Sequence, residues 1–161
     1  MNSLLKCVVF LSFVGFTVGA QAQFSSPASA PLSASTVPQA QQMQPAELVT
    51  LLKTDGAERP VVLQVGSRVM FQQAHIPGSK FAGPGSQPSG LALLKKVTGP
   101  IKKDQLIVIY CGCCPWGRCP NIGPAYKQLH DLGFTNVKAL YLANNFGDDW
   151  ASKGYPTDRG E

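Results

Sequence analysis

Residues 105–132 read QLIVIYCGCCPWGRCPNIGPAYKQLHDL, and this stretch decides the fold. Residues 105–110 are apolar enough to form a buried central strand. Residues 121–132 repeat their apolar positions at helical spacing, with Asn121 as the expected N-cap. The stretch therefore predicts a strand, a loop at 111–119 and a helix. In α/β proteins such a loop, at the carboxyl end of a strand, is where ligand sites form.

Strand and helix patterns alternate on both sides of this stretch. Helices or helical turns are predicted at 45–53, 69–74, 91–97 and 148–153, and further strands at 61–65 and 137–142. Strands that alternate with helices predict a parallel sheet covered on both faces, so the expected fold class is α/β. We expect this domain to span residues 45–161.

The composition limits the classes of protein that fit the chain. It has 161 residues and a formal net charge of +5, with 44% hydrophobic and 14% charged residues. This length fits one domain with additional segments rather than two sizeable domains. No Gly-X-Y period, sustained heptad or longer repeat is visible in the sequence, which excludes collagen and coiled coil. The basic residues form no stripe and no nucleic-acid motif, so nucleic acid is not an expected partner.

The first 22 residues have the layout of a secretory signal peptide. A short positive start ends at Lys6, and residues 7–19 (CVVFLSFVGFTVG) are apolar but shorter than a membrane span. Ala20-Gln21-Ala22 then gives small residues at the two positions that a signal peptidase reads. Cleavage after Ala22 predicts an exported, periplasmic protein without a membrane attachment; the alternative is an uncleaved anchor. Residues 23–44 are rich in Ser, Ala, Pro and Gln and carry no charge, so we expect a disordered linker.

Four of the five cysteines lie within nine residues, at positions 111, 113, 114 and 119. In an oxidising compartment such a cluster can hold a structural disulfide, and three intramolecular pairings of the four are possible. The loop also precedes a helix N-terminus, whose amides and positive dipole favour a thiolate, and Arg118 would hold an incoming anion. Four thiols beside an arginine favour a nucleophilic site over a purely structural one.

The sequence resembles the rhodanese-like sulfurtransferases at four places in the same order. These are Ala74–Ser79 (AHIPGS), Ile107–Cys111 (IVIYC), Leu129 with Leu132-Gly133-Phe134 and Val137, and Trp150 with Gly154-Tyr155-Pro156. The resemblance covers residues 45–156 and implies a three-layer fold, with a parallel five-stranded sheet and helices on both faces. It also implies an enzyme that moves sulfane sulfur from a donor such as thiosulfate to a thiophilic acceptor through a cysteine persulfide, without a cofactor.

The resemblance implies roles for the residues of the loop. Cys111 ends the strand and is the implied nucleophile, with Cys113 as its rival because Cys113 restores the family's Cys-x4-Arg spacing. The residues expected to bind substrate are Arg118, Gly112, Gly117 and Trp116. The residues expected to resolve a persulfide or form a disulfide are Cys113, Cys114 and Cys119. No metal is implied, and the expected partners are a small sulfur-containing anion or thiol and a redox partner protein.

The sequence departs from the family pattern at three places. The segment from Cys111 to Arg118 is Cys-x6-Arg, and a longer loop in a related branch handles phosphate or arsenate. Gln64-Val65-Gly66 stands where the family usually has Asp-Val-Arg, so we expect a buried ion pair to be missing. Asn144-Asn145 replaces a common Gly-Gly near the loop. These departures bear on the substrate more than on the fold.

Two other function classes use the same cysteines. The C-x-x-C at 111–114 suits an exported thiol–disulfide oxidoreductase of thioredoxin type, although the other motifs do not fit that class. Four thiolates in nine residues can also wrap a soft metal ion, zinc or copper(I). Metal analysis after gentle purification separates the metal-binding protein from the two sulfur-handling enzymes.

Overall fold

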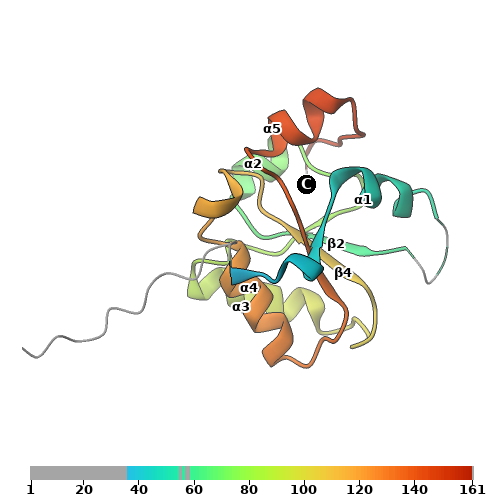
Figure 1. The fold of residues 1–161 in the computed structure, drawn as a ribbon. Helices are drawn as coiled ribbons and strands as arrows, with labels where there is room; N and C mark the ends of the chain where they lie inside the picture. Colours follow the sequence, from blue (N-terminus) through green and yellow to red (C-terminus); the bar gives the residue numbers. More distant parts are fainter. Residues whose placement is uncertain (1–35, 55, 57–58, 161) are drawn as a thin grey trace, which may run out of the picture.

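The computed structural model describes residues 36–54, 56 and 59–160. They form a five-stranded, wholly parallel sheet in the order β1-β5-β4-β2-β3, with helices on both faces (Figure 1). The predicted three-layer α/β fold is confirmed. The predicted signal peptide, residues 1–22, lies outside the described residues. None of the described helices combines the length and the apolar character that crossing a bilayer requires.

The elements follow the alternation that the sequence predicts. The strands are β1 (Gln42–Met43), β2 (Val61–Gln64), β3 (Lys80–Phe81), β4 (Ile107–Tyr110) and β5 (Val137–Leu140). The helices are α1 (Pro45–Leu51), α2 (Arg68–Gln73), α3 (Pro88–Thr98), α4 (Ile122–Asp131) and α5 (Phe146–Asp149). Each helix and strand predicted from the sequence is present, with its ends shifted by a few residues. The short strands β1 and β3 were not predicted.

Two hydrophobic cores hold the layers together, because successive residues of a strand point to opposite faces of the sheet. Leu63 of β2 packs in the core beneath α3 and α4, together with Leu129. Its neighbour Val62 packs in the other core, with Leu48 of α1 and with Trp150. Figure 1 shows the same division, with α3 and α4 on one side of the sheet and α1, α2 and α5 on the other. Full burial of such side chains contributes roughly 1.5–3 kcal/mol each, which fixes the helices on the sheet.

The prediction of a disordered linker over 23–44 is wrong for residues 36–44. Val37 is buried in one core and Met43 in the other. Met43 belongs to β1, which pairs with β5 and places Gln42 opposite Ala139. Two buried apolar side chains are enough to order this segment, because backbone pairing of the edge strand adds to the stability. The composition of a segment does not reveal such pairing. Residues 23–35 lie outside the described residues.

The carboxyl ends of β2 and β4 lie side by side and carry the segments that build the site. Gln64 pairs with Tyr110 at the end of the register, so the residues that follow each leave the sheet together. The hydroxyl oxygen of Tyr110 accepts a hydrogen bond from the backbone N–H of Ile76 at 3.2 Å and lies 3.2 Å from Oγ of Ser79. The AHIPGS segment is thereby tied to the central strand, directly before the cysteine loop.

Candidate active site: a cluster of four thiols

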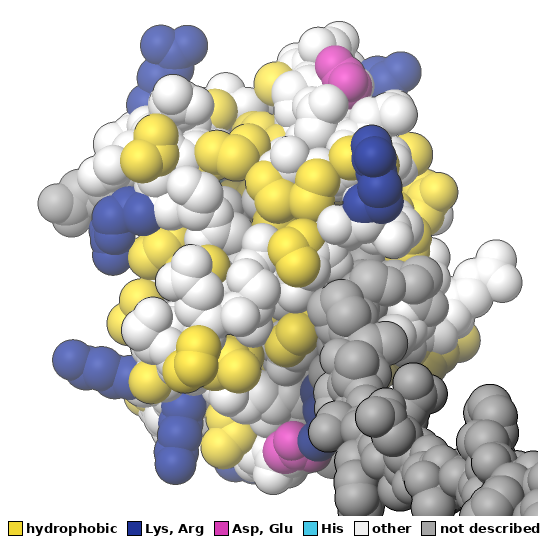
Figure 2. Space-filling view, turned by 90° about the vertical axis from the view of Figure 1, so that its left-hand side faces the viewer, with side chains coloured by type: hydrophobic (Ala, Val, Ile, Leu, Met, Phe, Trp, Pro, Cys, Tyr) yellow, Lys and Arg dark blue, Asp and Glu magenta, His cyan; other side chains and the backbone are white. Residues whose placement is uncertain are grey.

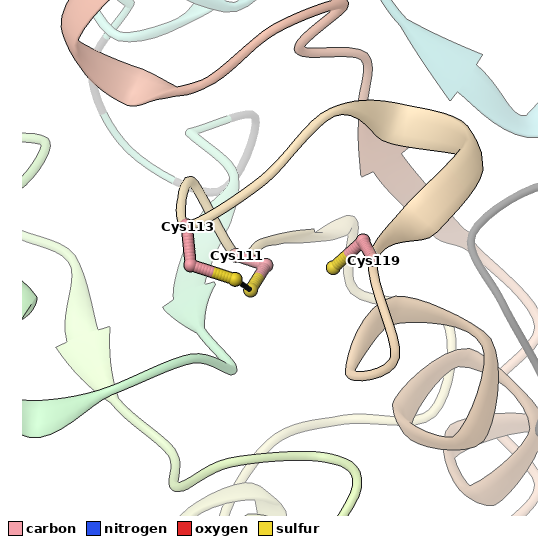
Figure 3. Close-up of side chains that lie close together, drawn as sticks. All are labelled: Cys111, Cys113 and Cys119. Atoms are coloured by element: carbon pink, nitrogen blue, oxygen red, sulfur yellow. Dashed lines mark hydrogen bonds between the residues drawn. The ribbon is translucent and has the colours of Figure 1, made fainter.

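The cysteine loop begins where β4 ends and closes just before α4. Cys111 directly follows β4, and Cys119 precedes the first helical residue, Ile122, by one short turn. The sulfur atoms of Cys111, Cys113 and Cys119 all lie within 4.8 Å of one another. In Figure 3 the side chains of Cys111 and Cys113 converge, and the sulfur of Cys119 is directed towards them across the loop. The cysteines that the sequence singles out therefore meet at the carboxyl edge of the sheet.

All four cysteines of the described part of the chain are free thiols. The Sγ–Sγ distance is 3.1 Å between Cys111 and Cys113 and 2.9 Å between Cys113 and Cys114, longer than the roughly 2.05 Å of a disulfide bond. Cys113 thus contacts a thiol on either side of it. The Sγ atom of Cys114 also donates to the backbone oxygen of Arg118 at 3.9 Å. The cluster is held by hydrogen bonds between thiols rather than by a covalent bond.

The thiols differ in how readily they ionise. Hydrogen bonds donated by Cys111 and Cys119 to its thiolate hold the pKa of Cys113 well below its usual range. The pKa of Cys111 is raised. The largest cause is its hydrogen bond to Cys113, and a hydrogen bond with Cys119 and burial add to the rise. Burial is the main cause that raises the pKa of Cys114. The first thiolate of the cluster therefore forms on Cys113, the one sulfur of the central three that is not buried.

The helix N-terminus acts on Cys119. A hydrogen bond from Cys111 lowers the pKa of Cys119, but the bond that Cys119 donates to Cys113 and its burial raise that pKa overall. The backbone N–H groups of Asn121 and Ile122 bond to the same sulfur and oppose part of the rise. The amides at the start of α4 thus reach Cys119, whereas the sequence led us to expect them at the nucleophile.

Asn121 is a site residue whose place in the sequence predicts only a helix cap. Its side chain makes no cap hydrogen bond. Its Nδ2 donates to Sγ of Cys111 at 3.2 Å and lies 3.9 Å from Sγ of Cys113, while its Oδ1 accepts from the backbone N–H of Ser86. A buried amide donor at these distances stabilises negative charge on sulfur. The sequence signal was ambiguous, since Asn before a helix is ordinarily its cap.

Gln64 joins the end of β2 to the cysteine loop without a charge. Its Nε2 donates to the backbone oxygen of Cys111 at 3.3 Å and to that of Ser67 at 3.4 Å, and its Oε1 accepts from the backbone N–H of Gly66 at 3.1 Å. The side chain is 2% exposed, and no ion pair of the described residues includes it. A neutral amide therefore stands where the resemblance implied a charged carboxylate.

Two glycines allow the backbone to approach the sulfurs closely. A Cβ atom on Gly66 would lie 2.9 Å from the backbone oxygen of Cys111 and 3.0 Å from its Sγ. Gly112 has a φ of +78°, and a Cβ atom there would lie 2.7 Å from Cβ of Phe146. The backbone N–H of Phe146 donates to the oxygen of Gly112 at 3.0 Å, which fixes the turn between Cys111 and Cys113. Gly112 also lines the first cavity described below.

Three residues predicted to bind substrate line neither cavity that opens on Cys113. Arg118 and Gly117 are exposed in a three-residue 3-10 turn. Trp116 packs against Tyr141, with ring centroids 5.2 Å apart. The backbone N–H groups of Trp116, Arg118 and Cys119 all donate to backbone carbonyl oxygens. These amides are already engaged within the protein, so this part of the longer loop does not form the expected anion cradle.

Two cavities open on Cys113. The first has a volume of about 350 Å³ and is lined by Cys111, Tyr110, Phe146 and three side-chain amides, those of Gln64, Gln73 and Asn145. The second has a volume of about 470 Å³ and is lined by Asn121, Ser67, Arg68, Phe81, Ser86 and Gln87 among others. Cys113 lines both cavities, whereas Cys111 lines only the first of the two. A small substrate can therefore reach the ionised sulfur from either cavity.

Comparison with solved structures identifies the fold. The rhodanese-like domain of the Alr3790 protein from Anabaena sp., solved by NMR, matches with a TM-score of 0.56 at 20% identity, over 74% of this chain and 79% of that chain. A crystal structure of the same protein matches with a TM-score of 0.56 at 20% identity, over 73% of this chain and 82% of that chain. The anaerobic ergothioneine biosynthesis enzyme from Chlorobium limicola, in complex with trimethyl histidine, matches with a TM-score of 0.54 at 19% identity. That match covers 74% of this chain and 28% of the enzyme.

The chain therefore has the rhodanese-like fold that the sequence resemblance implied. Scans against protein-family models and curated proteins find no match. At 20% identity these structural matches show the fold of the chain.

Proposed function

We propose that the protein is a sulfurtransferase that moves sulfane sulfur from a donor such as thiosulfate to a thiophilic acceptor through a cysteine persulfide. One observation carries this proposal: at the carboxyl edge of a rhodanese-like sheet, Cys113 lies in a cluster of thiols and lines two cavities, and hydrogen bonds from its neighbours lower its pKa. The thiolate is the nucleophilic form of cysteine. A covalent intermediate then divides the transfer into two displacement steps.

Cys113 is the better-supported nucleophile of the two candidates. Cys111 holds the position at the strand end, but its side chain is 4% exposed, and its hydrogen bond to Cys113 raises its pKa. Cys113 is more exposed, lines both cavities and carries the first negative charge. We therefore assign the attack to Cys113 and the supporting hydrogen bonds to Cys111 and Asn121.

The first step is attack of the Cys113 thiolate on the outer sulfur of thiosulfate. A new S–S bond forms on Cys113, the S–S bond of the donor breaks, and sulfite leaves with the bonding electron pair. In the second step cyanide or a thiolate attacks the terminal sulfur of the persulfide and takes it, and the Cys113 thiolate is restored. The amide of Asn121 and the neighbouring thiols donate hydrogen bonds to the charged sulfur, as preorganised donors do in other active sites.

The neighbouring Cys111 thiol allows a second reaction of the Cys113 persulfide, in which the transferred sulfur leaves as hydrosulfide. Sγ of Cys111 lies 3.1 Å from Sγ of Cys113. The terminal sulfur of the Cys113 persulfide can take the proton of the Cys111 thiol. The Cys111 thiolate then attacks the inner sulfur, a disulfide forms between the two cysteines, and hydrosulfide leaves with that proton. A dithiol partner protein must then reduce this disulfide before the next turnover. This branch gives the expected redox partner a role and links the oxidoreductase alternative to the same site.

Intact-mass measurement after incubation with thiosulfate tests the proposal. The reduced protein should gain the mass of one sulfur atom, and cyanide should remove it as thiocyanate. Cys113→Ser should abolish the gain, whereas Cys111→Ser should retain it because the ionised sulfur remains. A gain that survives in Cys113→Ser but not in Cys111→Ser would return the nucleophile to Cys111. If neither thiosulfate nor an organic persulfide produces a gain of one sulfur or the loss of two hydrogens that marks the Cys111–Cys113 disulfide, the sulfurtransferase is refuted.

A soft-metal site is the second candidate, because three sulfurs lie within 4.8 Å of one another. With metal–sulfur bonds of about 2.3 Å, three thiolates in a plane around one ion stand about 4 Å apart. The group includes no histidine or carboxylate among the described residues. Three sulfur ligands suit copper(I) better than zinc, which takes four ligands in structural sites.

Titration with copper(I) against a coloured chelator tests this second candidate. The reduced protein should compete for one equivalent of copper(I), and Cys119→Ser should weaken the competition. The same variant should still gain sulfur from thiosulfate, because it keeps Cys113. Failure of the wild-type protein to compete would refute the metal site and leave the sulfurtransferase standing.

A further inference from the structure

The two cavities that share Cys113 differ in charge. The first is lined by neutral groups, such as the amide of Gln64, beside the sulfur. The second is lined by Arg68 together with the hydroxyl groups of Ser67 and Ser86. Apart from the cysteines, Arg68 is the only charged side chain among the described residues that line either cavity. Of the two cavities that Cys113 lines, only the second therefore contains a positively charged side chain.

Arg68 is positioned without a carboxylate partner. It is the first residue of α2, and its Cζ atom lies 4.2 Å from the centroid of the Phe81 ring, which lines the same cavity. Stacking engages the flat side of a guanidinium and leaves its in-plane N–H groups to bind oxygen atoms. The one ion pair in the described part of the chain joins Lys127 and Asp131. No bound carboxylate therefore neutralises Arg68.

Other basic residues do not substitute for Arg68 at this site. Arg68 and Arg118 are both exposed, but Arg118, which the family spacing favours, lines neither cavity, whereas Arg68 lines the second. On the face shown in Figure 2, Lys and Arg side chains stand apart from one another and form no continuous patch. Among the residues that line the two cavities, Arg68 is the one whose positive charge could attract an anionic substrate to Cys113.

We propose that the second cavity is the anion subsite of the cysteine site, and that Arg68, rather than Arg118, binds the oxygen atoms of the sulfur donor. The guanidinium would hold two oxygens of a sulfonate-like group, and the hydroxyls of Ser67 and Ser86 would donate to the third. The outer sulfur of thiosulfate or of an organic thiosulfonate then faces the Cys113 thiolate. The donor class in this inference rests on the proposed sulfurtransferase function, whereas the anion subsite does not.

Alkylation of Cys113 by a charged and a neutral reagent tests the subsite without turnover. Iodoacetate is anionic and iodoacetamide is its neutral counterpart, so the ratio of their rates reports local positive charge. Arg68→Gln should lower this ratio about fivefold, the effect of one cation roughly 4 Å from an anion in water. Arg68→Lys should restore most of it, and Arg118→Gln, the matched control, should keep the wild-type ratio. Peptide mass mapping assigns the alkylated cysteine, and thermal unfolding checks the fold of each variant.

The outcomes separate the subsite from the proposed function. An unchanged ratio in Arg68→Gln, or an equal or larger fall in Arg118→Gln, would overturn the subsite. With thiosulfate as donor, Arg68→Gln should raise KM about fivefold and leave kcat at saturation nearly unchanged, for the same electrostatic reason. A fallen alkylation ratio in a protein that neither gains sulfur nor forms the Cys111–Cys113 disulfide with the donor would support the anion subsite and refute only the sulfurtransferase.

Discussion

Replacement of Asn121 by Asp changes the charge beside the sulfurs with almost no change in shape. The amide that donates to Sγ of Cys111 at 3.2 Å, and lies 3.9 Å from Sγ of Cys113, becomes a carboxylate oxygen. The hydrogen bond from the backbone N–H of Ser86 is retained, because the other oxygen of the side chain still accepts it. The variant therefore places a negative charge where the site now offers a donor.

The magnitude follows from the distance. Two unit charges 3.9 Å apart repel by about 1 kcal/mol in water and about 4 kcal/mol at an effective dielectric constant of 20. Because one pKa unit corresponds to about 1.4 kcal/mol, the pKa of Cys113 should rise by about 1 to 3 units. The sign is fixed, since a nearby negative charge disfavours the thiolate. Asn121→Ala removes the donor without adding charge and should give a smaller rise.

The pH dependence of iodoacetamide alkylation at Cys113, read by peptide mapping, measures this shift. The midpoint should move to higher pH in Asn121→Asp. Asn136→Asp is the control, because Asn136 is exposed and bonds to the backbone oxygen of Asp104 rather than to a sulfur. If the Asn121→Asp and Asn136→Asp midpoints coincide with the wild-type value, the assignment of Asn121 to the thiolate is refuted.

Three further predictions concern the scaffold, the alkaline limit and the N-terminus. Gly66→Ala should destabilise the protein by about 1–3 kcal/mol in urea unfolding, because its Cβ atom would lie 2.9 Å from a backbone oxygen; Gly117→Ala, with nothing within 4 Å, should not. Burial raises the pKa of Tyr110 from 10.0 to about 12, so the folded state holds that proton more tightly. Its contribution to stability should be complete below pH 10 and fall between pH 10 and about 12, a loss that Tyr110→Phe should reduce. We also propose export with cleavage after Ala22: the mature periplasmic chain should begin at Gln23, and a chain retained in the membrane with Met1 intact would contradict this.

The fold was largely predictable because its central elements carry long apolar patterns. The patterns at residues 105–110 and 121–132 predict β4 and α4 directly, and the alternation of further strands and helices indicates a parallel sheet. The strands β1 and β3 were not predicted because each has only two residues, too few to show a side-chain pattern. They are defined by the strands with which they pair. Val37 and Met43 were hidden in the same way, as isolated apolar residues in a polar segment.

The site was predictable in its position and in its cysteines, but not in the groups around them. Spacing along the chain keeps Cys111 and Cys113 close, because only Gly112 lies between them. Arg118 stands close in the sequence, yet a 3-10 turn carries it to the surface. Arg68 lines a cavity with Cys113, and Asn121 lies 3.9 Å from its sulfur; both residues lie outside the 111–119 loop, and no spacing rule for a single loop indicates such neighbours.

The uncharged link that Gln64 makes between β2 and the cysteine loop has a consequence for acidic conditions. An aspartate at this position would lose its charge as the pH falls, and the contacts that depend on that charge would weaken with it. The amide of Gln64 does not titrate, so its three hydrogen bonds persist through the acidic range. Any loss of reactivity in acid would then reflect protonation of the sulfur itself, with the shape of its surroundings preserved.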